Sequence, residues 1–392
     1  MSEKKFINGN VAVANAVKLS KTEVVAAYPI TPQSTIVEKI SEYIADGEMD
    51  AEFIKVESEH SALSAVYGAS VTGNRVFTAT SSQGLAYMFE VLPYISGSRL
   101  PVVMAVVNRG VAAPWSVWND HQDSIACRDT GWIQLYVETA QEALDTCLQA
   151  YRIAEETSVL TPVMVCLDGF VLSHTDELVE VPAQQEADAF LPAYQPAVEL
   201  NLEEPRAFVV GAGPEIYTEF KFQQQSAINK AKDVILEVDQ SFAKIFGRSY
   251  HGLVDSYCCE DAEAVLVTMG SVTGTARDSV DRLRAEGKKV GLLKLRSFRP
   301  FPEEVLRALL GDAKAVGVMD RSYSFGYAGA VGTEVKAALQ SLEQKVPVYN
   351  FIAGLGGRDI KGEDIEGIYD KLLQARNNPE GIEPVQFVGL RW

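Results

Sequence analysis

The sequence predicts an α/β fold in which parallel sheets are covered by helices on both faces. Short apolar runs alternate along the chain with longer stretches of helical periodicity. Several of these runs, such as Pro101 to Val107, are apolar at every position, which is typical of strands buried on both faces. The chain has no short-period repeat and no low-complexity tract, so a solenoid is not expected.

The first part of the chain contains five expected strands and five expected helices. Ser58 is a good N-cap, and it predicts that one helix begins at about Glu59. The other helices are expected at Val11 to Lys18, Thr35 to Ala45, Gly84 to Tyr94 and Ala140 to Glu156. The strands are expected at Val24 to Tyr28, Phe53 to Val56, Arg75 to Thr80, Pro101 to Val107 and Val163 to Leu167.

A second α/β unit is expected after an excursion over residues 177–250. The stretch from Glu177 to Pro205 is rich in Pro, Glu, Gln and Ala, and residues 216–246 predict one long helix or two. We place the domain boundary near Tyr257, which gives units of residues 1–256 and 257–392. In the second unit, strands are expected at 264–269, 289–295, 315–319 and 346–351, and helices at 274–286, 301–310, 329–342 and 365–375.

Composition excludes several classes of protein. The net charge of −18 argues against binding to nucleic acid or to anionic membranes. The amino terminus lacks the apolar core of a signal peptide, and no apolar run approaches membrane-spanning length. The five cysteines form no C-x-x-C pair, which disfavours a zinc or iron–sulfur site made by this chain alone. Their scatter fits reduced thiols and predicts a cytoplasmic protein.

Unusual polar residues follow three of the expected strands. Thr31 lies between Pro29 and Pro32, so its hydroxyl is held in a fixed direction, although a plain capping role explains it as well. Glu59 opens a helix of small residues, where the helix dipole favours its charged form and burial its neutral form. A solvated carboxylate on a closely packed helix is the alternative. Arg109 ends a buried strand, where it suits a carboxylate or phosphate ligand, or an intramolecular ion pair.

Other motifs carry less information. Residues 114–123 combine two tryptophans with Asp120, His121 and Asp123, which suits a pocket wall but gives no convincing metal-ligand spacing. Gly354 to Asp359 is equally consistent with an anion-binding loop and with a tight turn. Gly211 to Pro214 lacks the third glycine of a dinucleotide loop and favours a turn.

Taken together, these segments resemble the alpha subunit of the 2-oxoacid:ferredoxin oxidoreductase family, of which the pyruvate enzymes are the commonest members. The resemblance spans nearly the whole chain. The matching stretches are AYPITPQ (27–33), VESEHSA (56–62), TATSSQGL (78–85), VNR (107–109), NDHQD (119–123), RDTGW (128–132), LDGF (167–170), RSFRP (296–300) and GLGGR (354–358).

The resemblance implies a fold and a set of site residues. It implies a pyrimidine-binding domain of the thiamine diphosphate type, followed by a transketolase carboxyl-terminal-like domain. Glu59 then corresponds to the catalytic carboxylate that hydrogen-bonds the aminopyrimidine ring of the cofactor. Thr31 and Arg109 match positions that contact the 2-oxoacid, and Tyr28, Pro29, Ser82 and Gln83 are expected to line the same cleft.

The resemblance also implies partners. The diphosphate and magnesium motif of thiamine enzymes is missing here, as are the cysteine runs of iron–sulfur clusters. In the split-subunit form of the family, a beta subunit binds the diphosphate and Mg²⁺, a delta subunit carries [4Fe–4S] clusters, and a gamma subunit completes the complex. The expected reaction converts a 2-oxoacid and CoA to acyl-CoA, CO₂ and reduced ferredoxin. Pyruvate is the favoured substrate. The alternatives are 2-oxoisovalerate, suggested by the loop from Trp115 to Trp118, and a non-catalytic scaffold subunit.

Overall fold

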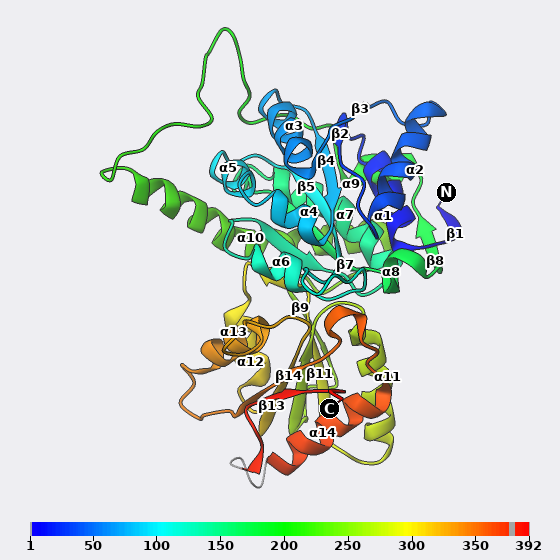
Figure 1. Cartoon of the computed structure of the whole chain (residues 1–392), viewed down its shortest axis with the longest axis vertical. Helices are drawn as coiled ribbons and strands as arrows, with labels where there is room; N and C mark the ends of the chain where they lie inside the picture. Colours follow the sequence, from blue (N-terminus) through cyan, green and yellow to red (C-terminus); the bar gives the residue numbers. More distant parts are fainter. Residues whose placement is uncertain (1, 376–380, 392) are drawn as a thin grey trace.

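The computed structural model describes residues 2–375 and 381–391, and it contains two large sheets and a small two-stranded one (Figure 1). The first sheet has seven strands in the order β12-β6-β7-β5-β4-β2-β3. Six of them run parallel, and β12, at one edge, is antiparallel to β6. They are β2 (Val24–Ala26), β3 (Glu52–Ile54), β4 (Val76–Thr80), β5 (Val103–Asn108), β6 (Ile133–Tyr136), β7 (Val163–Asp168) and β12 (Ser297–Arg299).

Helices cover both faces of the first sheet, as the apolar strands predicted. α1 packs on α2 and α7, whereas α4 packs on α3 and α6 on the other side of the strands (Figure 1). The helix expected at Gly84 to Tyr94 is instead two short helices, because Pro93 lacks the N–H that a continuous helix needs and opens a new one. The helices are α1 (Gly9–Leu19), α2 (Ser34–Ala45), α3 (Glu59–Val71), α4 (Ser82–Tyr87), α5 (Leu92–Gly97), α6 (Gln122–Ala126), α7 (Ala140–Glu155) and α8 (Val171–His174).

The region expected as an excursion contains more regular structure than its composition indicated. β8 (Glu177–Val181) pairs antiparallel with β1 (Glu3–Ile7), and α9 (Gln184–Phe190) follows it. Residues 191–216 contain only turns and bends, and they extend away from the body of the protein (Figure 1). The single long helix α10 (Tyr217–Phe246) then returns along the first unit and packs on α7.

The second sheet has six strands in the order β15-β14-β13-β10-β11-β9, all parallel except β9. α11 and α14 pack on each other, as do α12 and α13 (Figure 1). The elements are β9 (Val254–Tyr257), β10 (Ala264–Thr268), α11 (Val272–Ala285), β11 (Val290–Leu295), α12 (Glu303–Leu310), β13 (Ala315–Asp320), α13 (Ala330–Leu339), β14 (Val348–Ile352), the 3₁₀ turn η1 (Leu355–Gly357), α14 (Gly362–Ala375) and β15 (Val385–Phe387).

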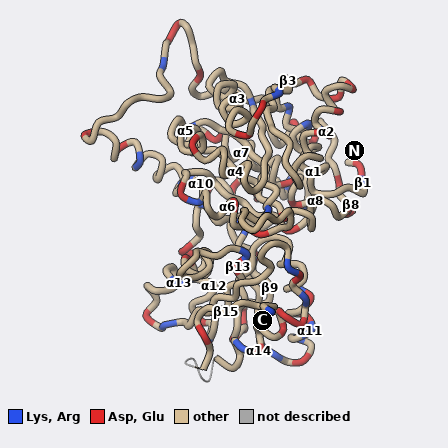
Figure 2. Tube along the Cα trace, in the orientation of Figure 1, with Lys and Arg blue, Asp and Glu red and all other residues tan. Residues whose placement is uncertain are grey.

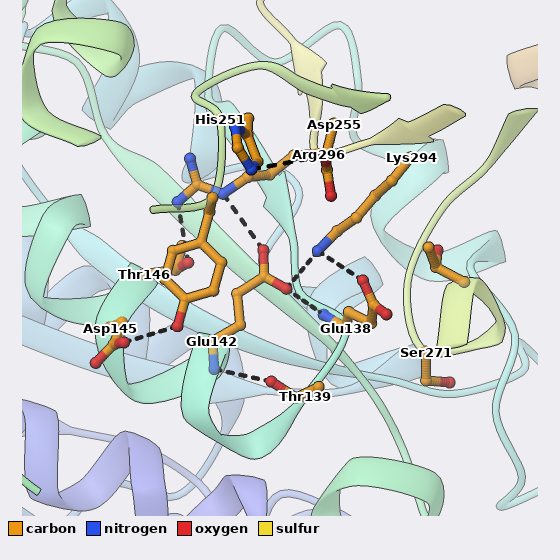
Figure 3. A network of polar contacts seen from close by, with 12 residues as sticks. Glu138, Thr139, Glu142, Asp145, Thr146, His251, Asp255, Ser271, Lys294 and Arg296 are labelled. Atoms are coloured by element: carbon orange, nitrogen blue, oxygen red, sulfur yellow. Dashed lines mark hydrogen bonds and ion pairs between the residues drawn. The ribbon is translucent and has the colours of Figure 1, made fainter. Parts of the chain in front are cut away.

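A buried polar network joins α7 to β11 of the second sheet (Figure 3). Lys294 Nζ donates to Glu142 Oε2 and lies 3.1 Å from Glu138 Oε2. Arg296 lies 3.4 Å from Glu142 Oε1 and donates to Gly252 O at 2.8 Å. Because buried charges are tolerated only with partners, this network fixes how the end of β11 meets α7.

Acidic residues occur along the chain in both parts of the molecule, with basic residues among them (Figure 2). The negative net charge is therefore distributed and does not mark one element as an acidic interface. Within residues 2–375 and 381–391, no helix is long and apolar enough to span a bilayer.

Candidate functional site

Four neighbouring strands of the first sheet deliver the polar residues that the sequence singled out. The strands lie side by side in the order β3, β2, β4, β5 and run parallel. Parallel strands end at the same edge of a sheet, which is where open α/β sheets bind ligands. The segments that leave this edge carry Glu59 after β3, Thr31 after β2, Ser82 and Gln83 after β4, and Arg109 after β5.

Glu59 is the first residue of α3, as its N-cap predicted. The side chain of Ser58 accepts a hydrogen bond from Ser61 N at 3.2 Å and fixes the start of the helix. Glu59 is half-buried, and the described part of the chain offers its carboxylate no hydrogen bond. As the first residue of α3, Glu59 lies at the positive end of the helix dipole, and its carboxylate oxygens are free to accept hydrogen bonds.

Gly84 brings the start of α4 close to Glu59. A Cβ atom on Gly84 would lie 2.8 Å from Glu59 Oε1 and 2.5 Å from Thr80 Oγ1, so only glycine fits without a shift. Thr80 Oγ1 is buried and has no hydrogen-bond partner among the described residues. The carboxylate of Glu59 and this hydroxyl therefore form a tight corner with unused polar atoms.

Arg109 is held by its neighbours but is not neutralised by them. Its side chain is 5 % exposed, and it donates to Thr31 O at 2.7 Å and to Ser116 O at 3.0 Å. Gln83 Oε1 lies 3.5 Å from Nη2, and the Trp115 ring centroid lies 5.7 Å from the guanidinium. Burial lowers the pKa of Arg109, although guanidinium still stays charged at neutral pH.

The intramolecular ion pair that was the alternative for Arg109 is not present among the described residues. Five N–H groups are available on a guanidinium, and the three contacts above leave two of them for a ligand. Arg109 is therefore a positive charge suited to a planar carboxylate.

The remaining predicted residues lie around this cation. Thr31 and Tyr28 are exposed, Tyr28 at 38 %, and so is Pro29 on the same loop. Ser82 is fully buried, and its Oγ lies 2.7 Å from Gly110 O and 2.6 Å from Gln83 Oε1. The structure thus brings Thr31, Gln83 and Arg109 into direct contact and places Ser82 behind them, while the side chains of Thr31, Tyr28 and Pro29 lie at the surface of the chain.

The segment expected to form a pocket wall has a divided role. Trp115 and Trp118 are exposed at 72 % and 52 %, whereas Asp120 is buried and accepts a hydrogen bond from Gly356 N at 3.0 Å. Its neighbour His121 bonds Asp168 at 2.7 Å. The loop from Gly354 to Asp359 is a tight turn against this segment, because Gly357 N donates to Asn119 O at 2.6 Å. Across residues 2–375 and 381–391, no group of three His, Cys, Asp or Glu side chains has a metal-binding arrangement.

Two buried carboxylates near the site were given no individual role from the sequence, where Asp123 was only part of an expected pocket wall and Asp168 only part of a matching motif. Asp123 touches the Ser82 and Arg109 backbones, and Asp168 joins the two units. Burial alone would raise the pKa of Asp168, but the Arg321 charge and the His121 ring outweigh it and hold that pKa well below its usual value. Asp168 is the last residue of β7, a position that the sequence could have marked, whereas Asp123 lies in α6 and the sequence does not show which strand ends it faces.

Comparisons with known proteins match both parts of the chain. Residues 15–240 match the family described as "Pyruvate flavodoxin/ferredoxin oxidoreductase, thiamine diP-bdg", and residues 262–365 match "Pyruvate:ferredoxin oxidoreductase core domain II". Pyruvate synthase subunit PorA of Methanothermobacter thermautotrophicus is 49% identical over 99% of this chain and 98% of its own length. The subunit of that name from Methanocaldococcus jannaschii is 51% identical over 96% of this chain and 97% of its own.

A branched-chain relative is nearly as similar. Ketoisovalerate oxidoreductase subunit VorA of Pyrococcus horikoshii is 47% identical over 95% of this chain and 94% of its own length. Among solved structures, 2-oxoglutarate:ferredoxin oxidoreductase from Magnetococcus marinus has a TM-score of 0.73 at 20% identity, covering 95% of this chain and 65% of that chain. A split-gene transketolase has a TM-score of 0.57 at 15% identity, covering 95% of this chain and all of that one. At these identities the two structures establish the fold alone.

Proposed function

Since the chain belongs to the pyruvate flavodoxin/ferredoxin oxidoreductase family, we propose that it is the alpha subunit of a 2-oxoacid:ferredoxin oxidoreductase. The reaction is the oxidative decarboxylation of a 2-oxoacid with CoA to acyl-CoA, CO₂ and reduced ferredoxin. The observation that carries the proposal is the placement of Glu59, Thr31, Gln83 and Arg109 after four adjacent parallel strands, with Thr31 and Gln83 in contact with Arg109. A non-catalytic scaffold subunit would not need a Glu59 carboxylate with free acceptors or an Arg109 guanidinium with unused N–H donors.

Arg109 is the proposed anchor for the substrate. A 2-oxoacid presents a planar carboxylate, which matches the two unused N–H groups of a guanidinium. Thr31 O and Ser116 O hold that guanidinium in place, at 2.7 Å and 3.0 Å. The exposed Thr31 side chain on the same loop then lies beside the bound acid, and Tyr28 and Pro29 extend the wall.

Glu59 is the proposed acid–base residue toward thiamine diphosphate. The carboxylate of Glu59 suits the edge of an aminopyrimidine ring, because it is half-buried and no described residue donates a hydrogen bond to it, while Gly84 lets the start of α4 pack closely against it. When bound, the cofactor supplies a carbon nucleophile for the keto group of the substrate. Glu59 would hold a proton at a ring nitrogen of the cofactor. Gly84 would let the start of α4 lie close to Glu59, and the half-buried position of Glu59 limits access of water to its carboxylate.

Partner subunits complete the proposed site. This chain lacks the diphosphate and magnesium motif and the cysteine runs of iron–sulfur clusters. We assign Mg²⁺ and the diphosphate to a beta subunit, the [4Fe–4S] clusters to a delta subunit and the remaining contacts to a gamma subunit, with ferredoxin as acceptor. A cytoplasmic location and the division into units of residues 1–256 and 257–392 stay predictions. β12, from the second range, completes the first sheet, so these units are interlocked.

Pyruvate is the proposed substrate, and 2-oxoisovalerate is the second candidate. Relatives named for both substrates cover nearly the whole chain, at 51% and 47% identity. The exposed Trp115 beside Arg109 is the feature that favours a larger acid, because it supplies an apolar surface next to the carboxylate anchor. A difference of one or two methylenes changes selectivity only about 10- to 200-fold. Ferredoxin or dye reduction by the co-purified complex across a panel of oxoacids decides between them.

The acid–base role is tested with Glu59→Gln in the assembled complex. We expect kcat at saturating thiamine diphosphate to fall by about 10²- to 10⁴-fold, which is the usual contribution of a general acid–base group. Glu57→Gln is the matched control, since Glu57 lies two residues earlier, is exposed and contacts Ser61. Near-wild-type turnover of both variants would refute the assignment and leave the scaffold alternative.

A further inference from the structure

Asp123 is a fully buried carboxylate whose acceptors are all used. It stands in the first turn of α6 and is 3 % exposed. Its Oδ2 accepts from the backbone N–H groups of Ser82 at 2.9 Å and Arg109 at 3.0 Å. Its Oδ1 accepts from Asn108 Nδ2 at 2.8 Å and from Ser124 N at 2.8 Å. One side chain therefore ties α6 to the ends of both β4 and β5.

The two bonds to Oδ2 fix the parts of the site that would face a substrate. They tie the backbone of the Ser82–Gln83 turn to the backbone of Arg109 through a single atom. The direct contact between the side chains of Gln83 and Arg109 is 3.5 Å long and therefore weak. Ser82 also has a φ of 48°, a backbone conformation that a non-glycine residue keeps only when its surroundings hold it.

The negative charge of Asp123 also acts on Arg109. Burial lowers the pKa of Arg109, and the nearby carboxylate of Asp123 opposes that shift. The two residues form no salt bridge. Asp123 accepts from the backbone N–H of Arg109, whereas the guanidinium of Arg109 donates to Thr31 O. Asp123 thus supports the charge of Arg109 without occupying the edge of the guanidinium that would bind a ligand.

We propose that Asp123 is a positioning residue that sets the spacing between Arg109 and the Ser82–Gln83 turn for binding the 2-oxoacid carboxylate. The inference rests on the proposed function, because it assumes that Arg109 binds the substrate. Asp123 acts through Arg109 and Ser82 and does not itself touch the substrate. Its loss should therefore weaken binding of the oxoacid more than it slows turnover of the bound acid.

A matched carboxylate in the second sheet separates positioning from folding. Asp320 ends β13, is 1 % exposed and accepts from Val331 N at 3.0 Å, Gly332 N at 2.8 Å and Asn350 Nδ2 at 2.7 Å. Burial raises the pKa of Asp320 to about 6, and it does the same for Asp123. The two groups have the same burial and the same kinds of donor, but Asp320 holds no residue of the proposed site.

The test compares Asp123→Asn with Asp320→Asn in the assembled complex. Each carboxylate oxygen of Asp123 accepts from two N–H donors. In Asp123→Asn the NH₂ group must face one of these pairs of donors in either orientation of the amide, so the two hydrogen bonds at that position are lost. We expect Asp123→Asn to raise KM for the oxoacid by about 10- to 100-fold, with a smaller change in kcat. We expect Asp320→Asn to lower the melting temperature and to leave KM within about two-fold of wild type. Equal KM values for the two variants would overturn the inference.

Two further variants keep the test decisive. If Asp123→Asn does not fold, Asn108→Ala removes one donor to Oδ1 and leaves both backbone bonds, and we expect a KM increase of about 2- to 10-fold. A folded Asn108→Ala protein with wild-type KM would then refute the inference. Arg109→Ala distinguishes the substrate role of Arg109 from the positioning role of Asp123. An unchanged KM in Arg109→Ala refutes the substrate role itself, whereas a raised KM there and a wild-type KM in Asp123→Asn refutes positioning alone.

Discussion

The guanidinium of Arg109 is fixed in direction by its neighbours but keeps N–H groups free for a ligand. Two backbone carbonyls accept from its guanidinium, and the described chain places no carboxylate in salt-bridge range. Carbonyl oxygens fix direction and leave the positive charge uncompensated, which is the condition a carboxylate ligand needs. An arginine paired with Asp or Glu, such as Arg75 with Glu155, has no such capacity.

Arg109→Ala in the assembled complex should raise KM for the oxoacid by about 10- to 100-fold, since a hydrogen-bonded charge is lost from the substrate site. Arg109→Lys should recover only part of the affinity, because an ammonium group cannot bind a carboxylate with a planar fork. Arg99→Ala is the control. Arg99 is also shielded and donates to two carbonyls, Leu160 O at 3.1 Å and Val159 O at 2.6 Å, but it follows α5 and is not one of the proposed site residues. Steady-state kinetics that give all three variants the same KM would exclude the anchor role.

At the scale of elements, the sequence predicted the strands that form short, mainly apolar runs and missed several that do not. Strands such as β4, β5 and β7 are buried at every position and stand out as short apolar runs. β6 was not predicted, because Gln134 interrupts its apolar run. The side chain of Gln134 is buried and donates to Ser124 O at 2.7 Å. β1 and β8 are partly exposed and carry charged residues, so their pairing is visible only in the structure.

The candidate site was predictable as a set of residues but not as an arrangement. Strand ends marked Thr31, Glu59 and Arg109, whereas sheet order decides that β3, β2, β4 and β5 are neighbours. Sheet order depends on contacts between distant segments and is not contained in local periodicity. For the same reason Asp123 appeared only as one acid in an aromatic segment, although it joins two strand ends.

The junction of α3 and α4 gives a prediction at this scale. Gly84→Ala should lower kcat in the assembled complex by at least about 10-fold, because its Cβ would meet Glu59 Oε1 at 2.8 Å and Thr80 Oγ1 at 2.5 Å and must displace the carboxylate. Gly68→Ala is the matched change within α3, where nothing lies within 4 Å of the new Cβ. It should stabilise the full-length chain by about 0.5–1 kcal/mol, as alanine does in a helix interior. Turnover of the complex tests Gly84→Ala, and the urea unfolding midpoint of the chain tests Gly68→Ala. Wild-type turnover of Gly84→Ala would contradict the close contact between Gly84 and Glu59.

At the scale of the whole molecule, three connections make the two sheets one structure. β12 leaves the second half of the chain to complete the first sheet, and the network around Glu142 and Lys294 holds α7 against β11 (Figure 3). The third is Asp168, at the end of β7, which accepts from Arg321 Nη1 at 2.7 Å and from Ser271 N at 2.9 Å. His121, two residues before Asp123, lies 2.7 Å from Asp168, so the third connection adjoins the segment that carries Asp123.

Asp168→Asn tests the third connection through the pH dependence of stability. The pKa of Asp168 is held below its usual value of about 3.8, so the unfolded chain binds more protons at this residue than the folded chain does in acid. The stability that Asp168 contributes is therefore complete above about pH 4 and is lost as pH falls below that value. At neutral pH we expect the variant to be less stable by about 3–5 kcal/mol, because Arg321 loses a buried partner.

The difference between wild type and Asp168→Asn should shrink by about 1 kcal/mol between pH 5 and pH 3, since one pKa unit corresponds to about 1.4 kcal/mol. Asp320→Asn is the control of opposite sign. Burial raises the pKa of Asp320 to about 6, so its contribution decreases as pH rises from about 4 to 6. Urea unfolding of the full-length chain from pH 3 to pH 7 measures both. Parallel pH curves for wild type and Asp168→Asn would show that Asp168 is not a charged link between the sheets.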